Sequence, residues 1–313
     1  MIDKNFIQAV KYIPNLLQRP SAWIGHLPFA YWLVKELNPK CLVELGTHYG
    51  HSYFSFCEAV SAKNEDAKFY AVDTWQGDEH AGIYDSIIYD EVKKNNEKYA
   101  KFSTLMKMTF DEAANNIENG SVDILHIDGL HTYDAVKHDF EKWFPKLRAG
   151  ALVLFHDTTV REKDFGVWKF WAEICDIYPN NIEFLHSYGL GVVQLNNCKE
   201  ENLLNWLKPG SSEGENVKEY FGAIGMHQMN RYRSYELEQQ IHELNINISE
   251  IKKNNEGRLA DLSLVIERQD IFIKQRESEI NSVSEEIFKI INSKSWRYTS
   301  GFRYLSNLFR RYK

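Results

Sequence analysis

The chain has 313 residues, of which 43% are hydrophobic and 14% aromatic, and a formal net charge of −7. This length exceeds that of a typical single domain, so we expect a core domain with an appendage. The negative charge argues against a general nucleic-acid binder, although residues 293–313 carry +6 with no acidic residue, which leaves −13 on residues 1–292.

The N-terminal segment, residues 1–38, is predicted to form a helical cap. It lacks the basic start and continuous apolar stretch of a signal peptide. No run in the chain approaches the roughly 18 apolar residues of a membrane span. The four cysteines contain no CxxC pair, which favours a reducing compartment and predicts a cytoplasmic protein; they are Cys41, Cys57, Cys175 and Cys198.

Strand-like and helix-like segments alternate between residues 39 and 198, the predicted core domain. Several of the strand-like segments are short apolar runs, as expected for strands that are covered on both faces. The alternation predicts an α/β fold with a Rossmann-like, doubly wound sheet. The strand-like segments are 41–46, 69–75, 103–108, 123–128 and 151–157, and the helix-like segments are 51–62, 110–119, 132–147 and 164–177.

Two more strand-like segments, 182–187 and 191–195, follow the last of these helices. Tyr188-Gly189-Leu190 between them predicts a tight turn and therefore an antiparallel hairpin. A parallel sheet that ends in such a hairpin departs from the nucleotide-dehydrogenase pattern, and it brings the expected number of strands to seven.

The composition changes near residue 199. A cluster of Pro, Gly and Ser at 208–214 predicts a linker over residues 199–232. Over 233–292 apolar residues recur every three or four positions in two registers joined by a stutter, which predicts a long coiled coil and a homo-oligomer. The alternative is one amphipathic helix folded back on the core domain. The apolar positions are Leu237, Ile241, Leu244, Ile248, Ile251, Leu259, Leu262, Ile266, Ile273, Ile280, Val283, Ile287 and Ile290.

The stretch VELGTHYGHS, residues 43–52, joins the first strand to its helix. Gly46 permits a sharp turn, Gly50 permits a ligand to approach the backbone, and the helix start offers unpaired N–H groups. The spacing differs from the G-x-G-x-x-G of dinucleotide sites, which disfavours an NAD-dependent enzyme. Glu44, two residues before Gly46, suits a cationic amino group, although a strand–turn–helix with an incidental Glu is the alternative.

Asp73 ends the second strand, which lies beside the first, and a carboxylate at that point typically accepts hydrogen bonds from ribose hydroxyls. An acid for an amino group and an acid for a ribose together predict an S-adenosylmethionine site. Residues after the third strand are placed to contact the adenine. The predicted donor-binding residues are Glu44, Gly46, Thr47, Gly50, Ser52, Asp73, Thr74, Phe110 and Asp111.

The stretch HIDGLHTYDAVKHD, residues 126–139, begins at the end of the fourth strand. Asp128 closes that strand and Asp157 closes the fifth, and ligands of such sheets lie beyond the carboxyl ends of the strands. With His131 and His156 nearby, these carboxylates can hold a divalent cation, or a histidine can accept the acceptor's proton. The third metal ligand is open between His131, His156 and Thr158. His126 is predicted to be a core histidine, and His138 and Asp139 are predicted to be solvated.

These motifs, with AVDTW and ALVLFHD, resemble class I S-adenosylmethionine-dependent methyltransferases, and most of all the macrocin-type sugar O-methyltransferases and cephalosporin-hydroxylase-type proteins. The resemblance covers about residues 20–195 and implies the seven-stranded fold. It also implies O-methylation of a sugar hydroxyl in surface-polysaccharide or glycoconjugate biosynthesis. Carboxylates matching Asp128 and Asp157 bind magnesium (Mg2+) in the metal-dependent members.

A second function of the whole chain stays open. The protein can instead be a coiled-coil scaffold or chain-length regulator of a polysaccharide-assembly complex, with an accessory or inactive methyltransferase domain.

Two shorter segments also have alternative roles. The basic amphipathic tail, 293–313, is predicted to contact an anionic membrane at its inner face or a glycosyltransferase partner, or else it is a frayed end. The polar segment 76–82 is either part of the acceptor site, a lid, or a plain connection.

Overall fold

The computed structural model describes residues 4–16, 21–60, 64, 66–78, 82–84, 86–162, 164–196, 199, 202–299 and 301. Contacts divide the chain into two units, Met1–Leu237 and Glu238–Lys313. In the described part of the chain no helix combines the length and the apolar character needed to cross a membrane.

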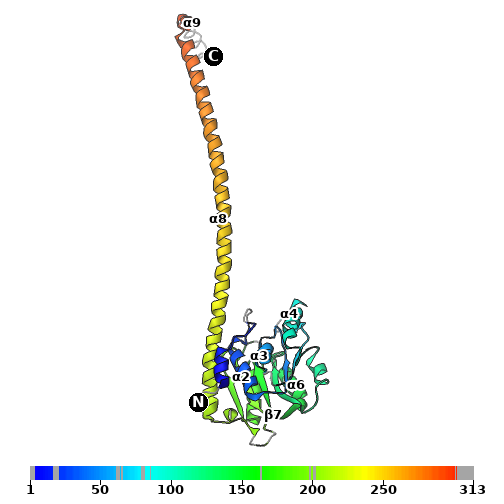
Figure 1. Ribbon diagram of the computed structural model, residues 1–313. Coiled ribbons are helices and arrows are strands. Elements are labelled where there is room, and N and C mark those ends of the chain that lie inside the picture. The colour runs from blue at the N-terminus through cyan, green and yellow to red at the C-terminus, as the bar shows by residue number, and fades with distance from the viewer. Residues whose placement is uncertain are drawn as a thin grey trace. The chain divides into compact units, whose positions relative to one another are not determined.

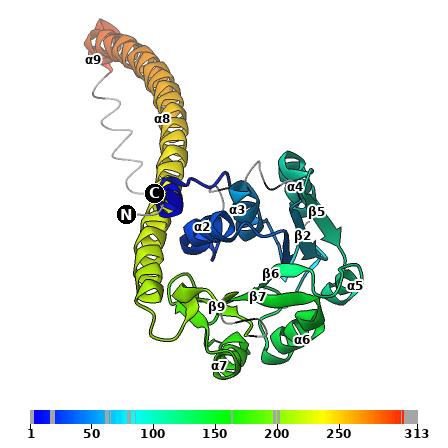
Figure 2. The same cartoon turned by 60° about the horizontal axis from the view of Figure 1, so that its bottom comes forward.

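The first unit is built around a seven-stranded sheet with the order β5-β2-β1-β6-β7-β9-β8 (Figure 2). The strands β5, β2, β1, β6 and β7 are parallel, whereas β9 is antiparallel to both β7 and β8. This confirms the predicted fold class and the terminal hairpin. The strands are β1 (Cys41–Leu45), β2 (Lys68–Asp73), β5 (Ser103–Lys107), β6 (Val122–Ile127), β7 (Leu147–His156), β8 (Asn181–Phe184) and β9 (Leu190–Gln194).

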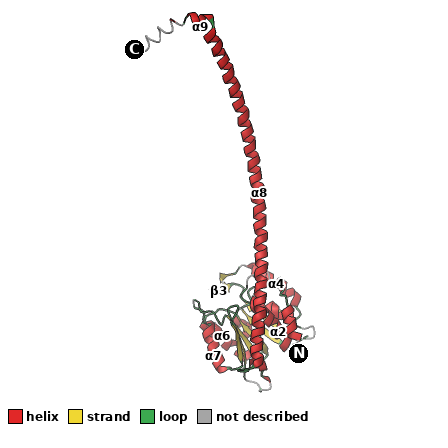
Figure 3. Ribbon diagram, turned by 90° about the vertical axis from the view of Figure 1, so that its left-hand side faces the viewer, coloured by secondary structure: helices red, strands yellow, loops and turns green. Residues whose placement is uncertain are grey.

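Helices cover both faces of this sheet (Figures 2 and 3). Successive strand residues point to opposite faces, so Leu42 belongs to one apolar core and Val43 to the other. On the first face lie α1 (Lys4–Lys11), α2 (Leu27–Leu37), α3 (His51–Ala59) and α4 (Ser86–Asn96), and on the second α5 (Phe110–Ala114), α6 (Tyr133–Trp143) and α7 (Val167–Ile177). Short 3-10 helices span Ile24–His26, Glu97–Tyr99, Phe144–Lys146 and Asn205–Leu207.

Two elements were not predicted from the sequence. The polar segment after β2 contains a two-stranded hairpin of β3 (Gly77–Asp78) and β4 (Gly82–Ile83), so it is more than a plain connection. The helix α4 follows it. Strands of two residues carry no detectable apolar alternation, which explains why the pattern did not predict them.

The predicted linker, residues 199–232, is wrong over most of its length. The helix α8 (Ser212–Asn292) already begins inside it, and the first unit extends to Leu237. Val217 and Phe221 of α8 lie one helical turn apart and are buried in the first apolar core, and Tyr232 further along the helix is buried as well. The glycines in this stretch weakened the helical pattern, but packing against the core stabilises the helix.

Two glycines of α8 offer a matched test of this packing. A Cβ at Gly225 would lie 2.4 Å from the backbone oxygen of Gly25, whereas a Cβ at Gly222 would meet no atom within 4 Å. We expect Gly225→Ala to lower the free energy of unfolding by roughly 1–3 kcal/mol. Gly222→Ala should raise it by roughly 0.5–1 kcal/mol, because alanine favours the helix. Urea unfolding measures both, and equal effects would contradict the close contact.

The second unit continues α8 and adds α9 (Lys294–Tyr298) (Figure 1). The predicted long helix is therefore confirmed, as α8 has 81 residues. The apolar side chains of the predicted coiled-coil line are between 48% and 63% exposed in the single chain. Their pairing with further copies stays a prediction. Residues 302–313, most of the predicted basic tail, lie outside the described residues.

Candidate functional site

A pocket of about 450 Å³, which we call the strand-end pocket, lies beyond the carboxyl ends of β1, β2, β6 and β7. Parallel strands end at the same edge of a sheet, so side chains far apart in the sequence meet there. Of the predicted donor-binding residues, Gly46, Thr47, Ser52, Asp73, Thr74 and Phe110 line it. The four predicted catalytic residues, Asp128, His131, His156 and Asp157, also line it.

Gly46 makes the turn between β1 and α3 possible. Its φ is +89°, and a Cβ there would lie 2.0 Å from the backbone oxygen of Asp128, so a larger residue cannot occupy this position without displacing the backbone. Gly50, also in the left-handed region, precedes α3 but does not line the pocket. The Thr47 hydroxyl is buried and has no hydrogen-bond partner among the described residues, so a pocket ligand can supply one.

Asp73 holds this turn against the end of β2. One carboxylate oxygen accepts hydrogen bonds from the backbone N–H groups of Thr47, at 3.0 Å, and His48, at 2.9 Å. The other accepts from the N–H of Trp75 at 2.7 Å. Each carboxylate oxygen can accept more than one hydrogen bond, so Asp73 retains capacity for a ligand hydroxyl in the pocket.

Glu44 does not reach the pocket, contrary to its predicted contact with an amino group. It is fully buried, and its Oε2 lies 2.8 Å from Nδ1 of His126. The two residues face each other across the β1–β6 pairing. Burial raises the pKa of Glu44, and the hydrogen bond from His126 opposes that rise. His126 is thus a buried, hydrogen-bonded histidine, as predicted.

Asp111 also lies away from the pocket. Its side chain is half exposed and lies 2.9 Å from Nε2 of His138. Aromatic residues that the sequence did not single out line the pocket instead: His48, Tyr49 and Tyr84. Tyr84 follows β4 and stacks on His48 with 4.5 Å between the ring centroids. Gly77 of β3 lines the pocket as well, so this segment reaches it, and its roles as part of the acceptor site or as a lid stay predictions.

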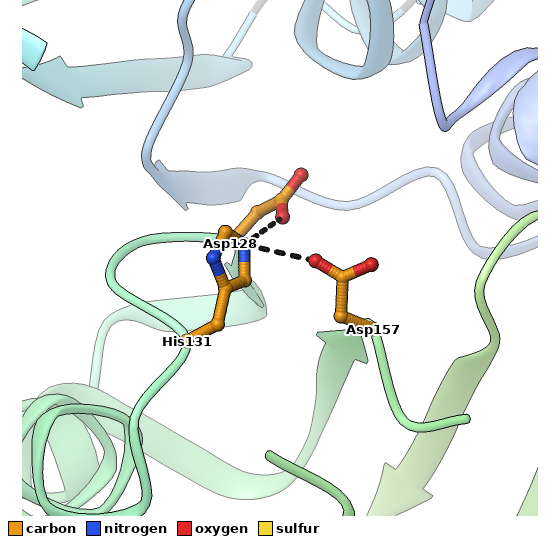
Figure 4. A group of neighbouring side chains, drawn as sticks. All are labelled: Asp128, His131 and Asp157. Atoms are coloured by element: carbon orange, nitrogen blue, oxygen red, sulfur yellow. Dashed lines mark ion pairs between the residues drawn. The ribbon is translucent and has the colours of Figure 1, made fainter. Parts of the chain in front are cut away.

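His131 lies between two carboxylates (Figure 4). Its Nε2 is 2.9 Å from Oδ2 of Asp157 and 3.7 Å from Oδ1 of Asp128. Asp128 follows β6 and Asp157 follows β7, so the β6–β7 pairing brings these two acids together. One ligand atom from each of the three residues lies within 4.8 Å of the others, which makes them a possible metal-binding group.

His156 lies deeper and contacts acceptors on both sides of its ring. Its Nδ1 is 3.2 Å from Oδ1 of Asp128, and its Nε2 is 3.1 Å from the backbone oxygen of Ser187. A carboxylate and a carbonyl only accept, so both ring nitrogens donate when the imidazole is protonated. Burial lowers the pKa of His156, but Asp128 and Asp157 outweigh burial and raise it to about 10.

Two acids and two histidines, which we call the acid–histidine cluster, compensate each other's charges; they are Asp128, His131, His156 and Asp157. Burial lowers the pKa of His131, but hydrogen bonds to Asp128 and Asp157 raise it to about 9. Burial raises the pKa of Asp128, but the attraction of His156 and the hydrogen bond from His131 hold it well below its usual range. The indole of Trp23 adds a hydrogen bond to Oδ2 of Asp128 at 3.0 Å. Two anions and two cations therefore balance at neutral pH.

The structure narrows the choice of a third metal ligand. His156 is occupied on both nitrogens, and Thr158 does not line the strand-end pocket. Of the three candidates, His131 is the one whose ring nitrogen lies with both carboxylates, and metal binding by this group stays a prediction. Two carboxylates and one imidazole suit a divalent ion that accepts nitrogen, such as Mn2+, better than Mg2+, which prefers oxygen.

Asp139 corrects one prediction, because it is 7% exposed rather than solvated. It lies on α6 below the turn that follows β6, where a Cβ at Gly129 would be 3.4 Å from its Oδ2. Burial raises the pKa of Asp139 to about 7, although His138 opposes the shift. His138 is exposed, as predicted.

The raised pKa of Asp139 predicts a pH-dependent stability. Because the folded protein favours the protonated form, this group adds to the free energy of unfolding. The addition is fully present below the ordinary pKa of Asp and is lost as the pH rises through about 7. Asp139→Asn should therefore raise the free energy of unfolding at pH 8, by up to about 4 kcal/mol, and not at pH 4. Urea unfolding at both values measures this. Glu141→Gln, at an exposed position of the same helix, is the control, and a pH-independent effect of Asp139→Asn would contradict the assignment.

Part of the chain matches a known family model and a relative. Residues 43–158 match the family model described as a methyltransferase domain. The uncharacterized protein y4gI of Sinorhizobium fredii is 53% identical over 180 residues, which are 58% of this chain and 20% of that protein. The chain thus matches about a fifth of the length of that relative.

Solved structures to which the chain shows some similarity include two O-methyltransferases. One is from Bacillus cereus in complex with SAH, with 14% identity, a TM-score of 0.42, and coverage of 62% of this chain and 92% of that chain. The other is TomG from Streptomyces achromogenes, involved in tomaymycin synthesis, in complex with SAM. It has 13% identity, a TM-score of 0.42, and coverage of 62% and 91%.

Proposed function

We propose that the protein transfers a methyl group from S-adenosylmethionine to an oxygen of its acceptor, because residues 43–158 match the model of a methyltransferase domain and lie in the seven-stranded sheet. One observation carries the proposal. The strand-end pocket combines the glycine turn and Asp73 with the cluster of Asp128, His131 and Asp157. A donor site and a group of acid–base residues thus share one pocket.

The donor side of the pocket is formed by the ends of β1 and β2. Asp73 keeps the turn at Gly46 in place and offers a carboxylate to ribose hydroxyls. The buried hydroxyl of Thr47 offers a further polar contact. S-adenosylmethionine supplies an activated methyl group on a positively charged sulfur. Glu44 is not part of this proposal, because it is buried against His126.

The acceptor side is formed by the ends of β6 and β7. The acceptor hydroxyl must lie close to the methyl carbon and lose its proton during transfer. We propose two routes for the proton. Either Asp128, His131 and Asp157 would hold a divalent cation, which would lower the pKa of the hydroxyl so that its proton passes to water, or His131 accepts the proton after releasing its own. Turnover measured with and without a chelator separates these routes.

We propose a sugar hydroxyl of a surface polysaccharide or another glycoconjugate as the acceptor, in keeping with the resemblance of the motifs. A scaffold or chain-length regulator remains the second candidate, because α8 presents a long line of exposed apolar side chains. In that case the methyltransferase domain would be accessory or inactive. Label transfer from methyl-labelled S-adenosylmethionine distinguishes the two functions.

Titration calorimetry with S-adenosylhomocysteine tests the donor assignment. We expect the full chain to bind it, and Asp73→Ala to weaken binding at least about 100-fold, since the variant loses a ligand contact and the anchor of the turn. Asp66→Ala, at an exposed position before β2, is the control and should bind as the wild type does. No binding by the wild type, or equal affinity in Asp73→Ala, would remove the assignment.

A further inference from the structure

A second cavity, of about 1180 Å³, lies beside the strand-end pocket, and we call it the α8 cavity. Ser21, Ala22 and Asp157 line both spaces. Phe165 lines the α8 cavity and stacks on the ring of His131, with 4.8 Å between centroids and 6° between planes. The α8 cavity therefore borders the residues proposed to handle the acceptor's proton.

One wall of this cavity comes from the start of α8, within the first unit. It consists of Met226, Met229, Asn230, Arg233 and Glu236, which recur at helical spacing on one side of the helix. Tyr232 of the same helix, residues of the segment 21–24, residues following β7 and residues preceding β9 form the remaining lining. The matched methyltransferase domain ends at residue 158, so this wall lies outside it.

The wall is held in place by contacts with the residues around the cluster. The backbone of Gly225 lies against Gly25, and the Ser187 hydroxyl donates to Sδ of Met229 at 3.4 Å. The backbone oxygen of the same Ser187 accepts the hydrogen bond from His156. Ser187 thus links the start of α8 to His156.

The lining combines aromatic rings with planar polar groups. Tyr188 is 59% exposed, and Phe165 and Tyr232 add two further rings. Asn230 and Arg233 present an amide and a guanidinium, which form directed hydrogen bonds with neighbouring hydroxyls. Sugars offer apolar C–H faces to aromatic rings and hydroxyls to such planar groups, so this composition suits a carbohydrate.

The size of the cavity indicates more than one sugar unit. At about 1180 Å³ it exceeds the roughly 300–1,000 Å³ of pockets for small ligands. We propose that the α8 cavity binds an oligosaccharide acceptor, with the sugar to be methylated at Asp157 and its other sugars along Asn230 and Arg233. This inference rests on the proposed methyl transfer, and it assigns acceptor selection to a helix outside the matched domain.

The test uses the full chain loaded with S-adenosylhomocysteine and an array of oligosaccharides with their component monosaccharides. We expect binding to one group of oligosaccharides and at least tenfold weaker binding to the monosaccharides. For a bound oligosaccharide, Asn230→Ala and Tyr188→Ala should each raise the Kd at least about fivefold. Their Kd for S-adenosylhomocysteine should stay within about twofold of the wild type. His227→Ala, at an exposed position of α8 outside the cavity, should change neither.

Three results would overturn the inference while leaving the proposed donor site intact. They are binding of S-adenosylhomocysteine without binding of any oligosaccharide, equal affinity for monosaccharides and oligosaccharides, and oligosaccharide binding that neither variant weakens. A failure of the wild type to bind S-adenosylhomocysteine would instead remove the proposed function itself.

Discussion

Asp128→Asn is expected to lower methyl-transfer turnover by roughly 10²- to 10³-fold while the affinity for S-adenosylhomocysteine stays within about twofold. The Asp128 carboxylate contacts the rings of His131 and His156 and accepts from Trp23. An amide in its place removes one negative charge and one hydrogen-bond acceptor, so the positive charges of His131 and His156 are no longer fully compensated. The residues proposed to bind the donor lie at the ends of β1 and β2 and keep their contacts.

Release of S-adenosylhomocysteine in the presence of an acceptor oligosaccharide measures this turnover, and calorimetry measures the donor affinity. Asp134→Asn is a suitable control, because Asp134 is exposed in the first turn of α6 and does not line the strand-end pocket. Normal turnover in Asp128→Asn would remove Asp128 from the mechanism. A parallel loss of donor binding would place Asp128 in the donor site instead.

Replacing two apolar residues of α8 should abolish self-association of the full chain. Ile266 and Ile273 lie one heptad apart on the predicted coiled-coil line and are 59% and 52% exposed in the single chain. Lysine at both positions would place two charges in the apolar seam between helices, where burying a charge costs free energy. We therefore expect an oligomer for the wild type and a monomer for Ile266→Lys with Ile273→Lys, by light scattering after size-exclusion chromatography.

The control pair, Gln275→Lys with Ser282→Lys, adds the same charge at exposed positions outside that line. It should keep the wild-type mass. A monomeric wild type would show that α8 does not pair and would favour the alternative of an amphipathic helix folded back on the core domain. An unchanged mass in the Ile266 and Ile273 variant would place the contact on another surface.

Local patterns in the sequence were enough to predict the sheet. Continuous apolar runs identified the strands, because a strand buried on both faces must be apolar throughout, and the short turn at Gly189 predicted the final hairpin. The positions of Asp128 and Asp157 at strand ends placed both carboxylates at one edge, where the structure brings them together. The apolar spacing after residue 233 predicted the long helix.

Other features depended on which residues face each other across the fold. Glu44 pairs with His126 because the β1–β6 register sets them opposite, and no local pattern contains that register. Asp139 looked like an ordinary surface residue of α6, but the turn at Gly129 packs over it. His156 acquires its second partner only where the backbone of Ser187 passes its ring.

The sequence by itself therefore determined which segments form strands, the class of fold and the acids at the strand ends. These follow from local apolar spacing and from a general property of parallel sheets. Only the tertiary structure decided that Glu44 is withdrawn from the pocket and that residues 212–237 belong to the first unit. It also decided that α8 forms a wall of the α8 cavity. The physical reason is that register and packing arise between segments distant in sequence, whereas a pattern of residues reports only on its own segment.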